Sequence, residues 1–201
     1  QTPRHQVYLK SYFIDRYEAT IGEYRRYIAE TGAQPPEIWK PFPGRLDPKD
    51  VYALFDISYP DAEAYCRWKG KRLPTEAEWE KAARGTDGRK WPWGDDLSKG
   101  ATNTLGSGPK WVAPPGSFSK DVSPYGIYDM GGNVMEWTSS WYLPYPGSDL
   151  KRDAFGEKYK VLRGGSWTSS LTPFGRTTHR FPVLSWIAQP DFGVRCAKDA
   201  Q

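Results

Sequence analysis

The first thirty residues show apolar patterns typical of a strand followed by a helix. Residues 7–15 are rich in β-branched and aromatic side chains, which predicts a strand. Thr20 is a good helix N-cap, and Gly32 is a typical helix stop. Between them, apolar residues recur at helical spacing: Ile21, Tyr24, Tyr27 and Ile28. The pattern therefore predicts a helix between Thr20 and Gly32.

Two more helices are predicted before residue 86. The first opens around Ser58, has Pro60 in its first turn and stops at Gly70. The second follows the capping-box sequence Thr-Glu-Ala-Glu at 75–78 and closes at Gly85. Their apolar stripes are Ala62, Tyr65 and Cys66 in the first helix and Trp79, Ala82 and Ala83 in the second.

The remaining segments have no sustained periodicity. Residues 33–57 are rich in proline and predict a long ordered loop, and only turns and short strands are expected after residue 85. Residues 161–163 and 192–197 have the composition of strands. Early helices followed by irregular β-structure predict a single α+β domain over residues 1–201, with few helices, short irregular strands and many loops.

The composition describes a loop-rich globular protein with an aromatic core. The chain has 10 Trp, 13 Tyr and 8 Phe together with 20 Gly and 18 Pro in 201 residues. Its net charge of +4 is small and dispersed, so we expect no nucleic-acid partner. No apolar run approaches the length of a membrane span, and the start shows no apolar signal region. We therefore expect no membrane span.

A glycine-rich turn at 126–137 is the first candidate site. Asp129 and Glu136 flank Gly131, Gly132 and Asn133. Carboxylates and inward-facing carbonyls at such a turn can supply the oxygen ligands that calcium requires. The same residues also suit a tight turn between strands with two solvated acids. The spacing alone leaves both readings open.

The cysteines and histidines are few. Cys66, Cys196, His5 and His179 are too scattered to form a usual Cys/His zinc site. The two cysteines could form one disulfide. They could equally be unrelated buried thiols in a reducing compartment.

Five motifs occur in an order that resembles one known family. They are the segments at 72–84, 92–94, 126–137, 163–167 and 193–196. Together they resemble the formylglycine-generating enzyme (sulfatase-modifying factor) family, whose members have a C-type-lectin-like fold. The likeness extends from about Val7 to Ala197. Family members usually begin with a Pro-Gly-Gly strand that this sequence lacks, so we expect a trimmed or unusual start.

The resemblance implies calcium in the glycine turn. Its ligands would be the Asp129 side chain, the Gly132 and Val134 carbonyls and the Glu136 carboxylate. A second calcium site would use Asn103 and the carbonyl of Thr104. Because residues 105–109 contain no carboxylate, we expect that second site to be lost or degraded.

The resemblance also implies a disulfide between Cys66 and Cys196. Disulfides persist in oxidising compartments. We therefore expect an extracytoplasmic protein that is periplasmic, secreted or surface-anchored after removal of a leader.

The catalytic positions depart from the family. Active members hold copper(I) between two cysteines that follow the Gly-Gly-Ser motif, and those positions correspond here to Ser169 and Phe174. Copper(I) requires soft thiolate ligands, so we expect no copper and no formylglycine formation by that route. The acidic residues Glu76, Glu78 and Glu80 are expected to be structural or solvated.

Two functions remain open. The first is a non-catalytic module that binds a protein, peptide or glycan, or that serves as an accessory subunit of an envelope complex. Its candidate ligand-binding residues are Ser169, Phe174, Arg176, His179, Arg180 and Trp186. The alternative is a cysteine-less tailoring oxidase, or a substrate-facing domain related to siderophore-maturation or sulfoxide-synthase enzymes. A non-haem iron site needs two histidines and a carboxylate, which His5 and His179 poorly supply, although His179 could act as a general base.

Overall fold

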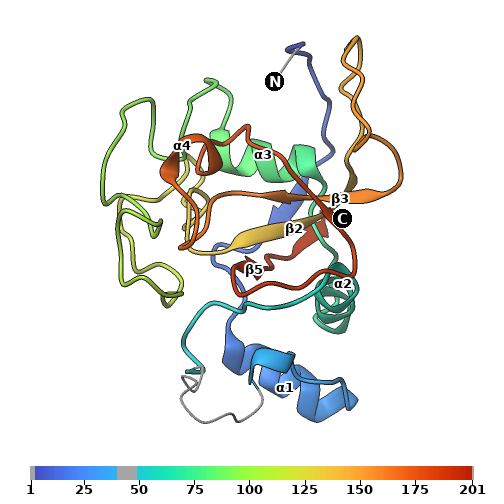
Figure 1. The fold of residues 1–201 in the computed structure, drawn as a ribbon, viewed down its shortest axis with the longest axis vertical. Coiled ribbons are helices and arrows are strands. Elements are labelled where there is room, and N and C mark those ends of the chain that lie inside the picture. Colours follow the sequence, from blue (N-terminus) through green and yellow to red (C-terminus); the bar gives the residue numbers. More distant parts are fainter. Residues whose placement is uncertain (1–2, 40–48, 201) are drawn as a thin grey trace.

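The structure is a computed structural model that describes residues 3–39 and 49–200. In that part of the chain, four α-helices and a 3-10 turn accompany six short strands (Figure 1). The helical elements are α1 Ile21–Thr31, η1 Glu37–Trp39, α2 Tyr59–Trp68, α3 Glu76–Arg84 and α4 Leu171–Phe174. The strands are β1 Tyr12–Ile14, β2 Met135–Trp141, β3 Tyr159–Arg163, β4 Phe181–Leu184, β5 Phe192–Gly193 and β6 Ala197–Asp199. The predicted α+β class is confirmed.

The three predicted helices are present, and their predicted caps form. The Thr20 hydroxyl accepts a hydrogen bond from the Glu23 amide, while the Glu23 carboxylate accepts one from the Thr20 amide. Gly32 ends α1 with a left-handed φ of 73°. Reciprocal capping boxes also begin α2 at Ser58 and α3 at Thr75.

The strands form two small sheets. The larger one has the order β4-β3-β2-β5, with β2 antiparallel to β3 and parallel to β5. The smaller one pairs β1 with β6 in antiparallel register. In Figure 1, α3 lies on one side of the larger sheet and α2 with α1 on the other. Loops from 85 to 134 cover one end of the sheet (Figure 1).

The strand predictions were only partly correct. The expected strand over 7–15 is paired only at Tyr12–Ile14, and β2 and β4 were not predicted. The first four residues of β2 are all buried, because elements cover both faces of the strand, so its sequence lacks the alternation of a half-exposed strand. Of the predicted loop at 33–57, residues 40–48 lie outside the described part.

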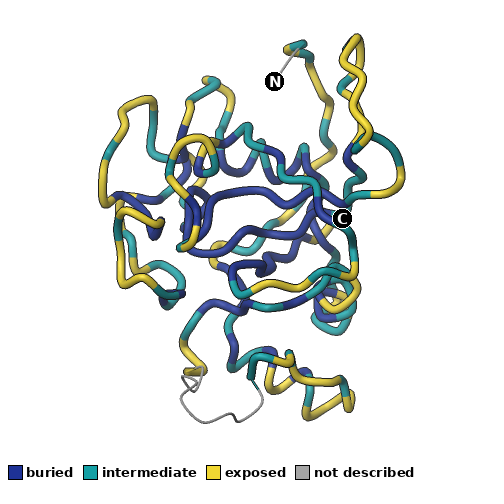
Figure 2. Tube along the Cα trace, in the orientation of Figure 1, coloured by how far each residue is buried: buried dark blue, intermediate teal, exposed yellow. Residues whose placement is uncertain are grey.

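The core is aromatic, as the composition indicates. Its largest cluster packs Tyr24, Tyr65, Trp137 and Leu162 around the Cys66–Cys196 disulfide, whose Cα atoms lie 5.6 Å apart. The disulfide confirms the predicted pairing. Figure 2 shows buried residues along the larger sheet and exposed residues in the long loops. No helix in the described ranges is long and apolar enough to cross a membrane.

Candidate functional site

The glycine turn connects distant loops to the start of β2. A Cβ on Gly132 would lie 2.3 Å from the Thr102 hydroxyl oxygen and 2.5 Å from the Asn103 carbonyl oxygen, so only glycine fits there. The Asn133 side chain accepts hydrogen bonds from the Asn103 amide group and the Ala113 backbone amide, at 3.0 and 2.9 Å. The turn therefore fixes the loop that carries residues 102–113.

Glu136 is held by an arginine from the other end of the chain. Arg195 donates three hydrogen bonds of 2.8–3.1 Å to its two carboxylate oxygens, and the Trp79 indole donates a fourth of 2.6 Å. Glu136 and Arg195 are both fully buried. As placed, this carboxylate does not fit a calcium ion, because the guanidinium occupies the position in front of its oxygens.

Three further carboxylates are buried nearby. Burial, followed by the charges of Asp129 and Glu136, raises the pKa of Glu18 well above its ordinary value. Burial also raises the pKa of Asp121 to about 8 and that of Asp129 to about 6. The Asp129 carboxylate accepts a hydrogen bond from the Gly116 amide at 2.5 Å. Arg195 is the cation that compensates this acidic centre.

Calcium at this turn stays a prediction. Within residues 3–39 and 49–200, no group of three or more His, Cys, Asp or Glu is arranged to hold a metal ion. Binding through Glu136 would require its carboxylate to exchange Arg195 for the ion. At the proposed second site, Asn103 is fully buried and donates to the Trp111 carbonyl, while its side-chain oxygen has no hydrogen-bond partner among the described residues. The loss of that site likewise stays a prediction.

The two positions expected, from the family resemblance, to correspond to catalytic cysteines carry no thiol. Ser169 is buried, and its hydroxyl accepts from the Ser166 amide at 2.8 Å and donates to the Ser166 carbonyl at 3.1 Å. Phe174 lies on α4 and packs against the His179 ring at 4.8 Å. Burial and the nearby charge of Arg163 lower the pKa of His179 to about 4, so its imidazole is neutral at neutral pH.

The remaining candidate residues do not form one surface. Arg180 is buried, pairs with Glu76 at 2.5 Å and lies over the rings of Tyr142 and Tyr145. Arg176, by contrast, is exposed beside α4 and lies over Trp91. Trp186 is 67% exposed and lies two residues after the end of β4. There the Ser185 carbonyl accepts a hydrogen bond from the amide of Tyr59, the first residue of α2. The structure brings Phe174, Arg176 and His179 together and leaves Trp186 apart.

The partners of several buried residues at the site were not expected from the sequence. Glu76 accepts hydrogen bonds from Arg163 and Arg180, which confirms its structural role. Asp191 accepts from the Ser166 and Thr168 hydroxyls at 2.8 and 2.5 Å. Arg163 and Arg195 stand inside two of the five motifs, and a buried arginine requires a carboxylate partner. The presence of Arg163 and Arg195 in these motifs was the sequence feature that could have predicted buried ion pairs at the site.

A family model described as a sulfatase-modifying factor enzyme 1-like domain matches residues 1–200. The chain belongs to this family. The sulfatase-modifying factor chain is 32% identical to the serine/threonine-protein kinase pkn1 of Chlamydia caviae over 98% of its own length and 34% of the kinase. It thus spans about a third of the chlamydial relatives that it matches.

Other relatives match the sulfatase-modifying factor chain over more of their own length. The inactive C-alpha-formylglycine-generating enzyme 2 of Mus musculus is 30% identical over 98% of this chain and 78% of that protein. The solved structure of PvdO from Pseudomonas aeruginosa superposes with a TM-score of 0.75 and 26% identity, covering 93% of this chain and 80% of that one. The fold expected from the five motifs is confirmed.

Proposed function

We propose that this chain is a non-catalytic sulfatase-modifying-factor module that binds a protein, peptide or glycan partner outside the cytoplasm. The observation that carries the proposal is the state of its thiols. The sequence contains two cysteines, and both are used in the Cys66–Cys196 disulfide. No thiolate is left to bind copper(I) at Ser169 or Phe174. The likeness to a mouse relative named as inactive supports this reading.

The disulfide supports a location in an oxidising compartment. Cys66 and Cys196 are fully buried, and the bond joins α2 to the segment before β6. Such bonds are rare where thiols are kept reduced. An extracytoplasmic module, or an accessory subunit of an envelope complex, fits this observation.

The exposed residues around α4 supply the proposed binding surface. Arg176 is exposed, and so are Thr168, Ser170 and Thr172 along the same stretch of chain. The Thr168 hydroxyl donates to Asp191 and the Ser170 hydroxyl to the Thr172 carbonyl. Arginine and hydroxyl groups suit recognition of peptides and glycans, because the guanidinium donates several hydrogen bonds in a planar fork and a hydroxyl rotates to donate or accept one. Ser169 is buried within the same stretch, whereas Arg180 is buried against Glu76 and is not part of this surface.

The purified protein is expected not to bind copper(I) and not to oxidise a peptide cysteine to formylglycine. The reason is that Ser169 and Phe174 provide no soft ligand. Copper(I) competition with a chromogenic chelator, together with mass spectrometry of a cysteine peptide, measures both properties. Stoichiometric tight binding, or formylglycine product, would show that the chain is an active enzyme.

Replacing Arg176 by glutamate is expected to abolish capture of the partner from a native envelope extract. The substitution reverses an exposed charge without touching the buried network, so the fold should be retained. Quantitative mass spectrometry of the captured material compares it with wild type. Lys151→Glu makes the same charge change on an exposed loop and serves as the control. Equal capture by the two variants would remove the α4 surface from the proposal.

A further inference from the structure

Two distant segments pack against neighbouring residues of the glycine turn. The loop at 102–107 contacts Gly132, and the segment that carries α4 contacts Gly131. A Cβ on Gly165 or on Gly175 would lie 2.6 Å from the Gly131 carbonyl oxygen, too close for any side chain. Gly175 has an ordinary helical φ of −73°, so the close approach to the turn requires glycine there, and the backbone conformation does not.

The loop and the α4 segment also contact each other. The Leu105 amide donates a hydrogen bond of 2.9 Å to the Ser169 carbonyl, two residues before α4 begins. Thr104 and Ser107 close a tight turn around Leu105 through two reciprocal backbone hydrogen bonds of 3.2 and 2.8 Å. In Figure 1, α4 and these loops lie at the end of the larger sheet opposite the C-terminus. The turn at 104–107 therefore adjoins the α4 surface.

The side chains exposed at this junction are largely apolar. Leu105 is 67% exposed. On the α4 side, Pro173 is exposed, and Leu171 and Phe174 are half-buried. Neighbouring apolar side chains that reach solvent on two adjoining segments are typical of a protein-interaction site.

The hydroxyl groups of the same stretch are mostly engaged within the protein. The Thr168 hydroxyl donates to Asp191, and the Ser170 hydroxyl donates to the Thr172 carbonyl. A glycan presents many hydroxyl groups, and each one that becomes buried without a hydrogen-bond partner weakens binding. Because the exposed apolar groups outnumber the free hydroxyls, the junction fits a protein better than a glycan.

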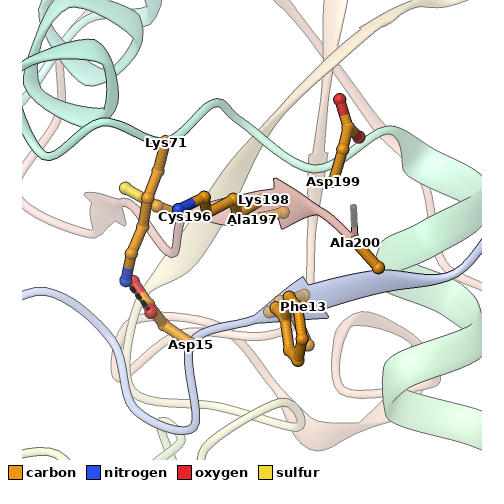
Figure 3. Close-up of a pocket in the computed structure, with 9 residues that line it drawn as sticks. Phe13, Asp15, Lys71, Cys196, Ala197, Lys198, Asp199 and Ala200 are labelled. Atoms are coloured by element: carbon orange, nitrogen blue, oxygen red, sulfur yellow. Dashed lines mark hydrogen bonds and ion pairs between the residues drawn. The ribbon is translucent and has the colours of Figure 1, made fainter.

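The guanidinium of Arg176 supplies the polar contact. The Trp91 ring lies against one face of the guanidinium, 5.8 Å from its central carbon. In the described part of the chain, no hydrogen bond or ion pair engages its N–H groups, which lie in the guanidinium plane and can bind a carboxylate in pairs. By comparison, in the open hollow of about 450 Å³ over the β1–β6 sheet, Lys71 and Asp15 point toward each other and form an ion pair (Figure 3).

We infer that the 104–107 turn and the α4 surface together bind a protein partner that presents an apolar side chain beside a carboxylate. The inference rests on the proposed function and narrows its ligand to a protein. Leu105 contacts the apolar side chain, and Arg176 binds the carboxylate. Gly131 and Gly132 are positioning residues, because they hold the two parts of this composite surface against one turn.

Leu105→Ser tests the apolar contact, with a native envelope extract as the probe. We expect it to reduce capture of the protein that Arg176→Glu also loses by about tenfold or more, because an exposed apolar anchor is removed. Leu150→Ser removes a leucine that is 49% exposed on another loop and should leave capture unchanged. In the captured complex, hydrogen exchange should slow at residues 104–107 and 168–176. Circular dichroism checks that both variants retain the fold.

Gly175→Ala tests the positioning role. Its methyl group would lie 2.6 Å from the Gly131 carbonyl oxygen, so α4 must move away from the turn. We expect capture to fall and the Leu105 amide to exchange about tenfold faster or more, while the amides of β2 keep their wild-type rates. The same methyl would lie 2.6 Å from the Leu171 Cδ1 atom. If adding Leu171→Ala restores the exchange rate of the Leu105 amide, the clash lies within α4 and the positioning role is wrong.

The inference also fails in three other cases. The first is equal capture by Leu105→Ser and Leu150→Ser, and the second is slowed exchange only outside residues 104–107 and 168–176. The third is capture that periodate treatment of the extract abolishes and protease treatment does not, which would assign the surface to a glycan. Loss of capture in Arg176→Glu with full capture by Leu105→Ser would remove this inference and leave the proposed function standing. Full capture by both variants would contradict both.

Discussion

Replacing Glu136 by glutamine is expected to lower the free energy of unfolding by about 3–5 kcal/mol, because it leaves the Arg195 charge buried and unpaired. Neither side chain of the pair reaches solvent, since Glu136 is 1% exposed and Arg195 0%. Water therefore cannot replace the lost carboxylate. Urea unfolding of wild type and variant at neutral pH measures the difference.

Two controls identify the cause of that loss. A double variant, Glu136→Leu with Arg195→Met, should recover part of the stability, because neither member of the pair is left buried without the other, although Glu18 and Asp129 lose a nearby cation. Asp199→Asn weakens an exposed ion pair with Arg72 and should change little. A Glu136→Gln variant as stable as Asp199→Asn would contradict the role given to Arg195.

A chelator distinguishes charge compensation of Glu136 by Arg195 from binding of the predicted calcium ion. If Arg195 alone compensates Glu136, wild-type stability should be the same with and without the chelator. If calcium binds there, the chelator should destabilise wild type, and elemental analysis should find the ion in the purified protein. The side-chain placement supports the first result.

Removing the disulfide in the double variant Cys66→Ala with Cys196→Ala is expected to cost about 4–5 kcal/mol. The bond closes a loop with a sequence separation of 130 residues, and in the chain-entropy model the stabilisation grows with loop length. It restricts the unfolded chain between α2 and the last strand. Urea unfolding with and without a reductant measures the effect.

The reductant provides an internal comparison for that measurement. Reduced wild type should unfold at nearly the same urea concentration as the double variant, whereas the double variant itself should not respond to reductant. A thiol assay on unfolded, unreduced protein should detect no free cysteine. Two reactive thiols, or a reductant effect equal in both proteins, would contradict the assigned bond.

The helices were predictable because their determinants are local. Thr20, Ser58 and Thr75 cap helices through contacts within three residues, and Gly32 and Gly85 stop helices through their own backbone conformation. These interactions form between neighbours in the sequence, so a pattern within one window records them. β2 was missed because its partners β3 and β5 come later in the chain, and because α2 and α3, which pack against it, remove the alternation of a half-exposed strand.

The candidate site was predictable only in part. The motifs located Ser169 and Phe174 in register with catalytic cysteines, and the structure places both near α4. The sequence grouped Trp186 with them, but β4 carries Trp186 to the α2 side of the molecule. It also placed Arg180 on a binding surface, whereas the structure buries it against Glu76. Closeness in the sequence to Ser169 and Phe174 therefore did not predict that Trp186 and Arg180 would lie on the same surface.

By itself, the sequence determined the helices, the aromatic core, the family and the absence of a thiol at Ser169 and Phe174. Only the tertiary structure decided the partner of Glu136, because Arg195 lies 59 residues away and its contact depends on how β2 and β5 pair. Buried charges take their partners from whichever strands the fold brings together, and no local pattern records that choice.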